Sequence, residues 1–209
     1  MTHAIFFLPK EVPMNFTDLR VMKTQERLQN ALLELLETKE LKAVTVKEIC
    51  DRAGISRNAF YQHYSYKEDL YDQMVAVATE RIREALTPVV TDVSQVRQET
   101  YAAYARRFIG GISEVRDLIY VMLKGDDGIF LRQLTDLIFG QILTNSFPFF
   151  DVKDSAELRL YYEFLSAGLA AFIVKWILEE GIAEGQATAL LAEILRQVST
   201  GIPMRLAGR

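Results

Sequence analysis

The sequence predicts an all-α protein, in which a three-helix N-terminal bundle containing a helix-turn-helix is joined by a fourth helix to a helical C-terminal domain. Three observations support this prediction. Apolar residues recur at three- and four-residue spacing, and no segment keeps the two-residue alternation of a half-buried strand. Capping residues precede the apolar stretches, and glycine or proline follows them. The expected divisions are a flexible extension over 1–21, the bundle over 22–72 and the second domain over 73–209.

The first predicted helix spans residues 24–38. Its apolar residues form a single helical stripe: Leu28, Ala31, Leu32, Leu35 and Leu36. A second helix is expected to begin after Thr45, because Thr45 and Glu48 have the threonine-x-x-glutamate spacing of a capping box. We expect it to end at Gly54, since glycine tolerates the left-handed conformation found just beyond a helix end.

A short third helix is expected after Ser56, which is placed to cap it, and Ser65 with Glu68 offers a second capping box for the fourth helix. Further helices are expected near residues 92–110, 115–123, 129–146, 155–180 and 186–199. Between these helices, Gly110-Gly111 and Pro148 are interpreted as breaks. The whole chain therefore reads as helix after helix.

The overall charge of the 209-residue chain is −4, which by itself counts against a nucleic-acid-binding protein, because DNA affinity comes largely from phosphate neutralisation. The local charge has the opposite sign. From Lys39 to Lys67 there are six lysines and arginines against three acidic residues, a local charge of +3. Cys50 is the only cysteine, so no intramolecular disulfide can form. Charged residues interrupt every long apolar run, so we expect a cytoplasmic protein without a membrane span.

One segment carries side chains suited to reading DNA. A glycine-containing turn at 53–56 fits a helix-turn-helix, and Arg57, Asn58 and Tyr61 then share an outward face near the start of the second helix of that motif. Arginine can bond guanine or phosphate, asparagine can pair with adenine, and a tyrosine hydroxyl can bond a phosphate. Lys67 begins the next helix, where free backbone N–H groups also attract phosphate.

The run from Phe60 to Leu70, Phe-Tyr-Gln-His-Tyr-Ser-Tyr-Lys-Glu-Asp-Leu, resembles the signature of the TetR family, the tetracycline-repressor or AcrR-like regulators. The resemblance covers about residues 22–72, and Tyr66 departs from it where the family has a small polar or acidic residue. By position, the resemblance implies DNA contacts by Thr45, Lys47, Arg57, Asn58, Ala59, Tyr61, His63 and Lys67. For Tyr61 a packing role, and for His63 a structural hydrogen bond, remain alternatives.

The C-terminal part contains a helical stretch, 158–178, that is apolar on almost every face and must therefore be buried on every face. Burial against a second subunit accounts for this pattern, and the resemblance implies dimerisation through two helices of each subunit. The expected homodimer interface comprises Leu165, Gly168, Leu169, Phe172, Trp176, Leu191, Ile194 and Leu195. Burial in the core of a single chain remains the alternative.

Aromatic residues are frequent between the predicted DNA-binding bundle and the predicted dimer helices, and aromatic side chains suit an apolar ligand pocket. The expected effector-pocket residues are Tyr101, Tyr104, Phe108, Tyr120, Phe139 and Phe164. Each of these also suits a packed core, so both interpretations stay open.

Together these features predict a homodimeric DNA-binding transcriptional regulator. We expect a repressor that an effector bound in the C-terminal domain releases from a palindromic operator of double-stranded DNA. The effector is a small molecule or a protein. A regulator controlled by a partner protein, an activator, and an interaction protein that has lost DNA binding are alternatives. With His3 and His63 as the only histidines and a single cysteine, the sequence shows no catalytic or metal-binding cluster, so we expect no enzyme activity, metal or cofactor.

Overall fold

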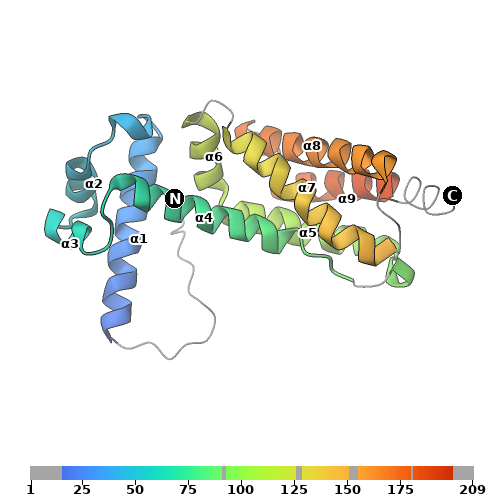
Figure 1. Cartoon of the computed structure of the whole chain (residues 1–209), viewed down its shortest axis with the longest axis horizontal. Helices are drawn as coiled ribbons and strands as arrows, with labels where there is room; N and C mark the ends of the chain where they lie inside the picture. The colour runs from blue at the N-terminus through green and yellow to red at the C-terminus, as the bar shows by residue number, and fades with distance from the viewer. Residues whose placement is uncertain (1–15, 91–92, 126–128, 151–154, 180, 200–209) are drawn as a thin grey trace. The chain divides into compact units, whose positions relative to one another are not determined.

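The computed structural model describes residues 16–90, 93–125, 129–150, 155–179 and 181–199, and the regular structure within these ranges is entirely helical (Figure 1). The predicted all-α class is confirmed. The chain forms two compact units. Of the described residues, 16–78 together with 117–125 group in the first unit, and those of 79–116 and 129–199 group in the second. The predicted division at residue 72 does not include the grouping of 117–125 with the first unit.

The first unit contains α1 (Phe16–Leu36), the 3₁₀ turn η1 (Leu41–Ala43), α2 (Val46–Ala53), α3 (Arg57–Tyr61), the first part of α4 (Lys67–Ala85) and α6 (Arg116–Gly125). Its core consists of side chains with no exposed surface from four helices, namely Leu28, Leu32, Ile49, Phe60 and Leu70. These residues come from the apolar stripe of α1 and from single positions on α2, α3 and α4. Helices α2 and α3 and the start of α4 are therefore held against α1 by one shared core.

The first helix begins earlier than the sequence predicts, at Phe16 instead of near Thr24. The Thr24 hydroxyl donates a hydrogen bond to the Arg20 carbonyl at 2.9 Å, as side chains do inside a helix. No glycine or proline occurs between 16 and 36 to stop the helix. The expected flexible extension therefore overlaps α1 over 16–21, and its remainder lies outside the described residues.

The caps of α2 and α3 confirm the sequence prediction. The Thr45 hydroxyl accepts a hydrogen bond from the Glu48 N–H at 3.3 Å, and the Glu48 carboxylate accepts one from the Thr45 N–H at 2.9 Å. Gly54 ends α2 in the left-handed conformation, with φ of +63°. The Ser56 hydroxyl accepts from the Ala59 N–H at 3.1 Å. Both ends of the turn are thus closed by local hydrogen bonds.

The cap of α4 is one residue away from its predicted position. The carboxylate of Asp69, not that of Glu68, accepts hydrogen bonds from the N–H groups of Ser65 and Tyr66, each at 2.9 Å. The reason is that α4 begins at Lys67, so the third helical residue, which reaches back to the cap, is Asp69. The predicted pairing of Ser65 with Glu68 is wrong in register.

The second unit contains the end of α4, η2 (Val93–Gln95), α5 (Gln98–Glu114), α7 (Ile129–Phe150), α8 (Ala156–Leu178) and α9 (Glu184–Ser199). Within it α5 packs against α9 and α7 packs against α8 (Figure 1). The Arg116 guanidinium lies 4.9 Å from the centre of the Trp176 ring and donates to the Trp176 carbonyl at 2.8 Å. A cation therefore closes the C-terminal end of α8, where helix carbonyls lack partners.

Two predicted breaks lie inside helices instead. Helix α5 continues through Gly110 and Gly111, and α7 continues through Pro148 to Phe150. A Cβ atom at position 111 would lie 2.8 Å from the Cβ of Ala85 on α4. Gly111 is therefore explained by the close approach of two helices and not by a turn.

Helix α8 is long and apolar enough to cross a membrane by length and composition, contrary to the sequence expectation that no segment would be. A core helix of a helical bundle meets the same criteria. One face of α8 is buried in its own chain through Leu158, Tyr162, Ser166, Ala170 and Ile173. The opposite face leaves Leu160 and Phe164 largely exposed.

Candidate nucleic-acid interface and ligand cavity

The helix-turn-helix comprises α2, the turn around Gly54 and α3. Its inner surface is buried through Ile49, Cys50 and Phe60. Arg27 of α1 donates a hydrogen bond from Nη2 to the Gly54 carbonyl at 3.2 Å, which ties the turn to the first helix. Arg27 was not predicted, because it lies 27 positions from Gly54 in the chain and no local pattern links the two residues.

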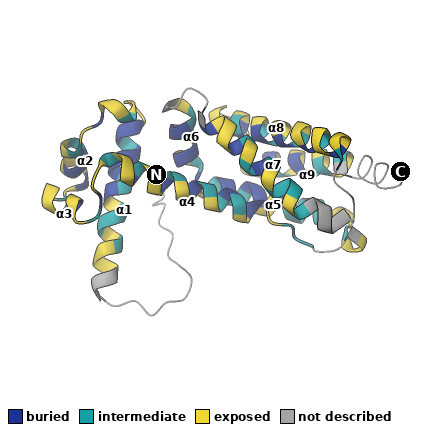
Figure 2. Ribbon diagram, viewed as in Figure 1, coloured by how far each residue is buried: buried dark blue, intermediate teal, exposed yellow. Residues whose placement is uncertain are grey.

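The outward face of α3 carries the predicted base-reading residues. Arg57, Asn58 and Tyr61 are exposed, and Ala59 is half-buried; in Figure 2 most of the α3 ribbon has the yellow of exposed residues. The Tyr61 ring meets the Phe60 ring edge to face at 5.5 Å, while 57% of Tyr61 stays exposed. Tyr61 thus combines a packing contact with an accessible hydroxyl. A five-residue helix with one buried anchor presents three polar side chains to solvent.

The two DNA contacts predicted at the start of α2, Thr45 and Lys47, differ in whether their polar groups are already engaged. Lys47 is exposed. Thr45 is exposed too, but its hydroxyl is part of the capping box and donates to the Glu48 carboxylate at 2.8 Å. Hydrogen bonds from Lys39 and Thr45 lower the pKa of Glu48 from 4.5 to about 2. Glu48 is therefore ionised at neutral pH and holds Lys39 at 2.5 Å.

Several cations of the positive segment have carboxylate partners. Lys39 pairs with Glu48, Lys42 with Glu40 at 2.5 Å, and Arg52 with Glu34 at 2.8 Å. Among the described residues, Lys47 and Arg57 have no carboxylate within 4.0 Å. The charge available to a phosphate or a base is therefore concentrated at these two side chains, on α2 and α3.

Lys67 is placed differently from the other predicted phosphate contacts. Its ammonium donates to the carbonyls of Leu41 at 2.8 Å, Lys42 at 3.2 Å and Val44 at 2.6 Å, and its side chain is only 16% exposed. A lysine ammonium has three N–H groups, and here all three are used. Lys67 therefore fastens the segment that precedes α2 to the start of α4. His63 is half-buried, with its ring 6.3 Å from that of Tyr64.

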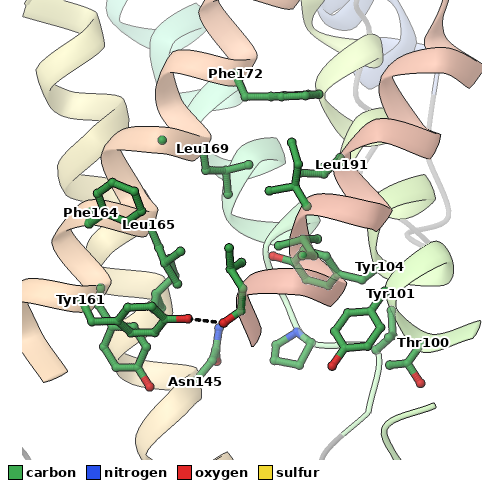
Figure 3. A pocket seen from close by; sticks show the side chains of 18 of the residues that line it. Thr100, Tyr101, Tyr104, Asn145, Tyr161, Phe164, Leu165, Leu169, Phe172 and Leu191 are labelled. Atoms are coloured by element: carbon green, nitrogen blue, oxygen red, sulfur yellow. Dashed lines mark hydrogen bonds between the residues drawn. The ribbon is translucent and has the colours of Figure 1, made fainter. Parts of the chain in front are cut away.

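The second unit contains a cavity of about 500 Å³ between α5, α8 and α9, with the end of α7 as a further wall (Figure 3). Of the six predicted effector residues, Tyr101, Tyr104 and Phe164 line it. Phe108 does not: it is fully buried and stacks on Tyr104 with ring centres 6.2 Å apart. Tyr120 and Phe139 also lie outside the lining.

Most residues predicted for a dimer interface line this same cavity, namely Leu165, Gly168, Leu169, Phe172, Leu191, Ile194 and Leu195. Trp176 is a core residue instead, since it is 3% exposed and donates from Nε1 to the Ile182 carbonyl at 3.2 Å. Leu191 is 2% exposed and so is also buried within its own chain. The large apolar residues exposed on α8 and α9 are Leu160, Phe164, Leu178, Leu190 and Ile194, of which Phe164 and Ile194 are among the residues predicted for the pocket and the dimer interface.

In the part of the chain that the structure describes, no group of three histidine, cysteine or acidic side chains lies together in a way that could hold a metal ion.

Residues 29–74 match the family model described as bacterial regulatory proteins, tetR family. An uncharacterised HTH-type transcriptional regulator of Bacillus subtilis strain 168, YxbF, is 27% identical over 178 residues. The match covers 79% of this chain but 42% of that protein, so the chain spans less than half the length of this relative.

Two solved structures have a similar fold. The dihydroxyacetone kinase operon activator DhaS aligns with a TM-score of 0.58 at 14% identity, over 87% of this chain and 97% of DhaS. A TetR transcriptional regulator from Streptococcus agalactiae 2603V aligns with a TM-score of 0.53 at 18% identity, over 86% of this chain and 97% of that structure. At these identities the likeness establishes the fold, an N-terminal helix-turn-helix followed by a helical domain.

Proposed function

We propose that this chain, whose residues 29–74 match the tetR family of bacterial regulatory proteins, is a dimeric transcriptional repressor that an effector releases from a palindromic DNA operator. The observation that carries the proposal is the outward face of α3. Arg57, Asn58 and Tyr61 are exposed together on a helix whose ends and inner face are fixed by caps and by buried Phe60. Such a helix can enter the major groove without rearrangement.

Base recognition is assigned to α3 and positioning to its neighbours. Arg57 suits the paired acceptors of guanine, and Asn58 suits adenine. Lys47 on α2 and the Tyr61 hydroxyl on α3 belong to exposed residues and suit phosphate oxygens. Arg27 and Lys67 are positioning residues that do not contact DNA in this proposal. They hold the turn and the segment before α2 in place.

A dimer is part of the proposed DNA-binding mechanism. One head offers few cations without carboxylate partners, and the chain as a whole carries −4, so a single head would bind weakly. Two heads related by a two-fold axis read two half-sites of a palindrome. Exposed apolar residues of α8 and α9, among them Leu160, Phe164, Leu190 and Ile194, support pairing of these helices with those of a second copy.

The proposed regulation couples the two units through a continuous helix. Helix α4 runs from Lys67 in the first unit to Ala85 in the second, and residues 88–90 beyond it line the cavity. A ligand in the cavity shifts the operator affinity only if it binds the DNA-free and DNA-bound states with different affinities.

The test begins with selection of operator sites from random double-stranded DNA by the purified full-length protein. Binding of Arg57→Ala to the selected site and to scrambled DNA is then measured by fluorescence anisotropy. We expect the preference for the site to fall at least about 10-fold, as loss of a bidentate base contact costs about 1–3 kcal/mol. The control is Arg132→Ala, which removes an exposed arginine from α7. Absence of any selected sequence, or equal binding by Arg57→Ala and the parent, would overturn the proposal.

A further inference from the structure

The cavity of the second unit is open between two helices that do not pack against each other along their length. Helix α5 packs on α9 and α7 packs on α8, while α8 and α9 face each other across the space (Figure 3). At one end the Tyr161 hydroxyl spans the gap and donates to the Val198 carbonyl at 2.6 Å. The space of about 500 Å³ is partly open to solvent, since exposed Phe164 is among its lining residues, and its size lies in the range of ligand sites.

The chemistry of the walls is almost purely apolar. Among the described residues that line the cavity, none carries a formal charge. The apolar end is formed by Leu169, Phe172 and Leu191 (Figure 3). An ionised group placed here would lose its hydration without gaining a counter-charge, which is strongly unfavourable.

Polar groups are confined to the other end of the cavity. Asn145 lies there beside the hydrogen bond from Tyr161, and Thr100 and Tyr101 lie next to each other at the same end (Figure 3). The Thr100 hydroxyl already accepts from the Arg97 N–H at 2.9 Å. The Tyr101 hydroxyl and the Asn145 amide are side-chain groups at this end that can both donate to and accept from a ligand. An amide both donates and accepts, and so does a protonated phenol.

The tyrosines at this end are neutral at physiological pH. Burial raises the pKa of Tyr104 and of Tyr161 to about 12, and it also raises the pKa of Tyr101. The charged group that acts on Tyr101 is Arg196, whose guanidinium is paired with the Glu193 carboxylate at 2.5 Å. The polar end therefore provides uncharged hydrogen-bonding groups, not a site for an anion or a cation.

We propose that this cavity binds a neutral, elongated apolar molecule with a single hydrogen-bonding head group, such as a long-chain alcohol. The head group lies at Tyr101 and Asn145, and the apolar chain extends between α8 and α9 towards Leu169 and Phe172. The binding site is inferred from the cavity alone. The further statement that its ligand is the effector of the regulator rests on the proposed function.

The test uses full-length protein and the neutral fluorescent probe N-phenyl-1-naphthylamine. Displacement of the probe is compared for decan-1-ol, decanoate and decylammonium, which share a chain length and differ in head-group charge. We expect the alcohol to displace the probe at a concentration at least about 10-fold lower than either ion, because neither ion finds a counter-charge in the cavity. Tyr101→Phe, which keeps the ring, should weaken the alcohol about 5-fold and leave the probe unchanged.

A pair of glycine substitutions locates the site. A Cβ atom at Gly168, which lines the cavity, meets nothing within 4 Å, so Gly168→Phe should fill the space and weaken the probe at least about 10-fold. The control is Gly140→Phe on α7, where a Cβ also meets nothing within 4 Å but which does not line the cavity. Circular dichroism checks that both variants keep the parent's helix content.

Four results would overturn the inference: equal displacement by decanoate, an unaffected Gly168→Phe variant, equal loss in Gly140→Phe, or probe binding by monomers that disappears on dimerisation. The last result would mean that a second copy of the chain fills the space. DNA binding is measured on the same samples. Loss of ligand binding with intact operator binding refutes only this inference, whereas ligand binding without operator binding refutes only the proposed function.

Discussion

Replacing Lys67 with methionine distinguishes two roles of its ammonium group, which are to hold backbone carbonyls in place and to bind a DNA phosphate. The substitution keeps the length of the side chain and removes the ammonium, which donates to three carbonyls at 2.6–3.2 Å. Two of these bonds, to Leu41 and Val44, are partly buried, and the third is exposed. A hydrogen bond to a charged group contributes about 1.5–3 kcal/mol, so loss of the two partly buried bonds should lower the free energy of unfolding by about 3 kcal/mol.

The matched variant is Lys47→Met, which removes an exposed lysine from α2. It should change the free energy of unfolding by less than about 0.5 kcal/mol, as is usual for exposed surface residues. If Lys47 bonds a phosphate, it should reduce the salt dependence of operator binding by about one unit of slope per subunit. Lys67→Met should leave that slope unchanged and weaken binding only by disordering the segment before α2.

Two measurements distinguish the structural role of Lys67 from a phosphate contact. Amide hydrogen exchange of the peptides that cover residues 39–50 reports the local stability, and Trp176 fluorescence during urea unfolding reports the second unit as an internal control. Fluorescence anisotropy at several salt concentrations gives the slope. Unchanged exchange in Lys67→Met, together with a slope reduced as in Lys47→Met, would refute the structural role and assign the ammonium to a phosphate.

Three further predictions concern packing, titration and assembly. Gly111→Ala should lower the free energy of unfolding by about 1–2 kcal/mol, because its Cβ would lie 2.8 Å from that of Ala85. Gly110→Ala, where a Cβ meets nothing within 4 Å, should raise it by about 0.5–1 kcal/mol, and equal effects in thermal unfolding would contradict the close helix approach. The Glu48 carboxyl should titrate near pH 2 by ¹³C NMR, since its pKa is lowered from 4.5 to about 2. The stability that this carboxylate contributes is then complete above pH 4.5 and is lost as the pH falls towards 2. A titration midpoint near pH 4.5 would disprove the capping geometry. Phe164→Glu, at a side chain that is 71% exposed, should convert the proposed dimer into a monomer in sedimentation analysis without loss of helix content, and a persisting dimer would place the interface elsewhere.

Local features of the DNA-binding unit were predictable because the interactions that create them span only three or four residues. The Thr45–Glu48 capping box, the left-handed Gly54 and the Ser56 cap all follow from the sequence in this way. Where two candidate residues are adjacent, the same reasoning fails by one position. Glu68 and Asp69 both suit the cap of α4, and the start of the helix at Lys67 selects Asp69.

Three of the six residues predicted for an effector pocket line the cavity, and a pair on α5 shows why the sequence could not separate wall from core. Tyr104 and Phe108 are one helical turn apart on α5 and equally suited to a pocket or a core. The structure places Tyr104 on the cavity wall and Phe108 behind it, stacked on its ring. Periodicity identifies the buried face of a helix but not which neighbour each residue of that face meets.

The sequence by itself determined the all-α class, the helix-turn-helix and the outward triad of Arg57, Asn58 and Tyr61, because these depend on local spacing and capping. Only the tertiary structure decided that Lys67 binds backbone carbonyls and that residues expected in a dimer interface line a cavity. The carbonyls lie 23–26 positions before Lys67 in the chain. Contacts over such separations depend on how whole helices pack, and no short-range pattern of residues encodes that packing.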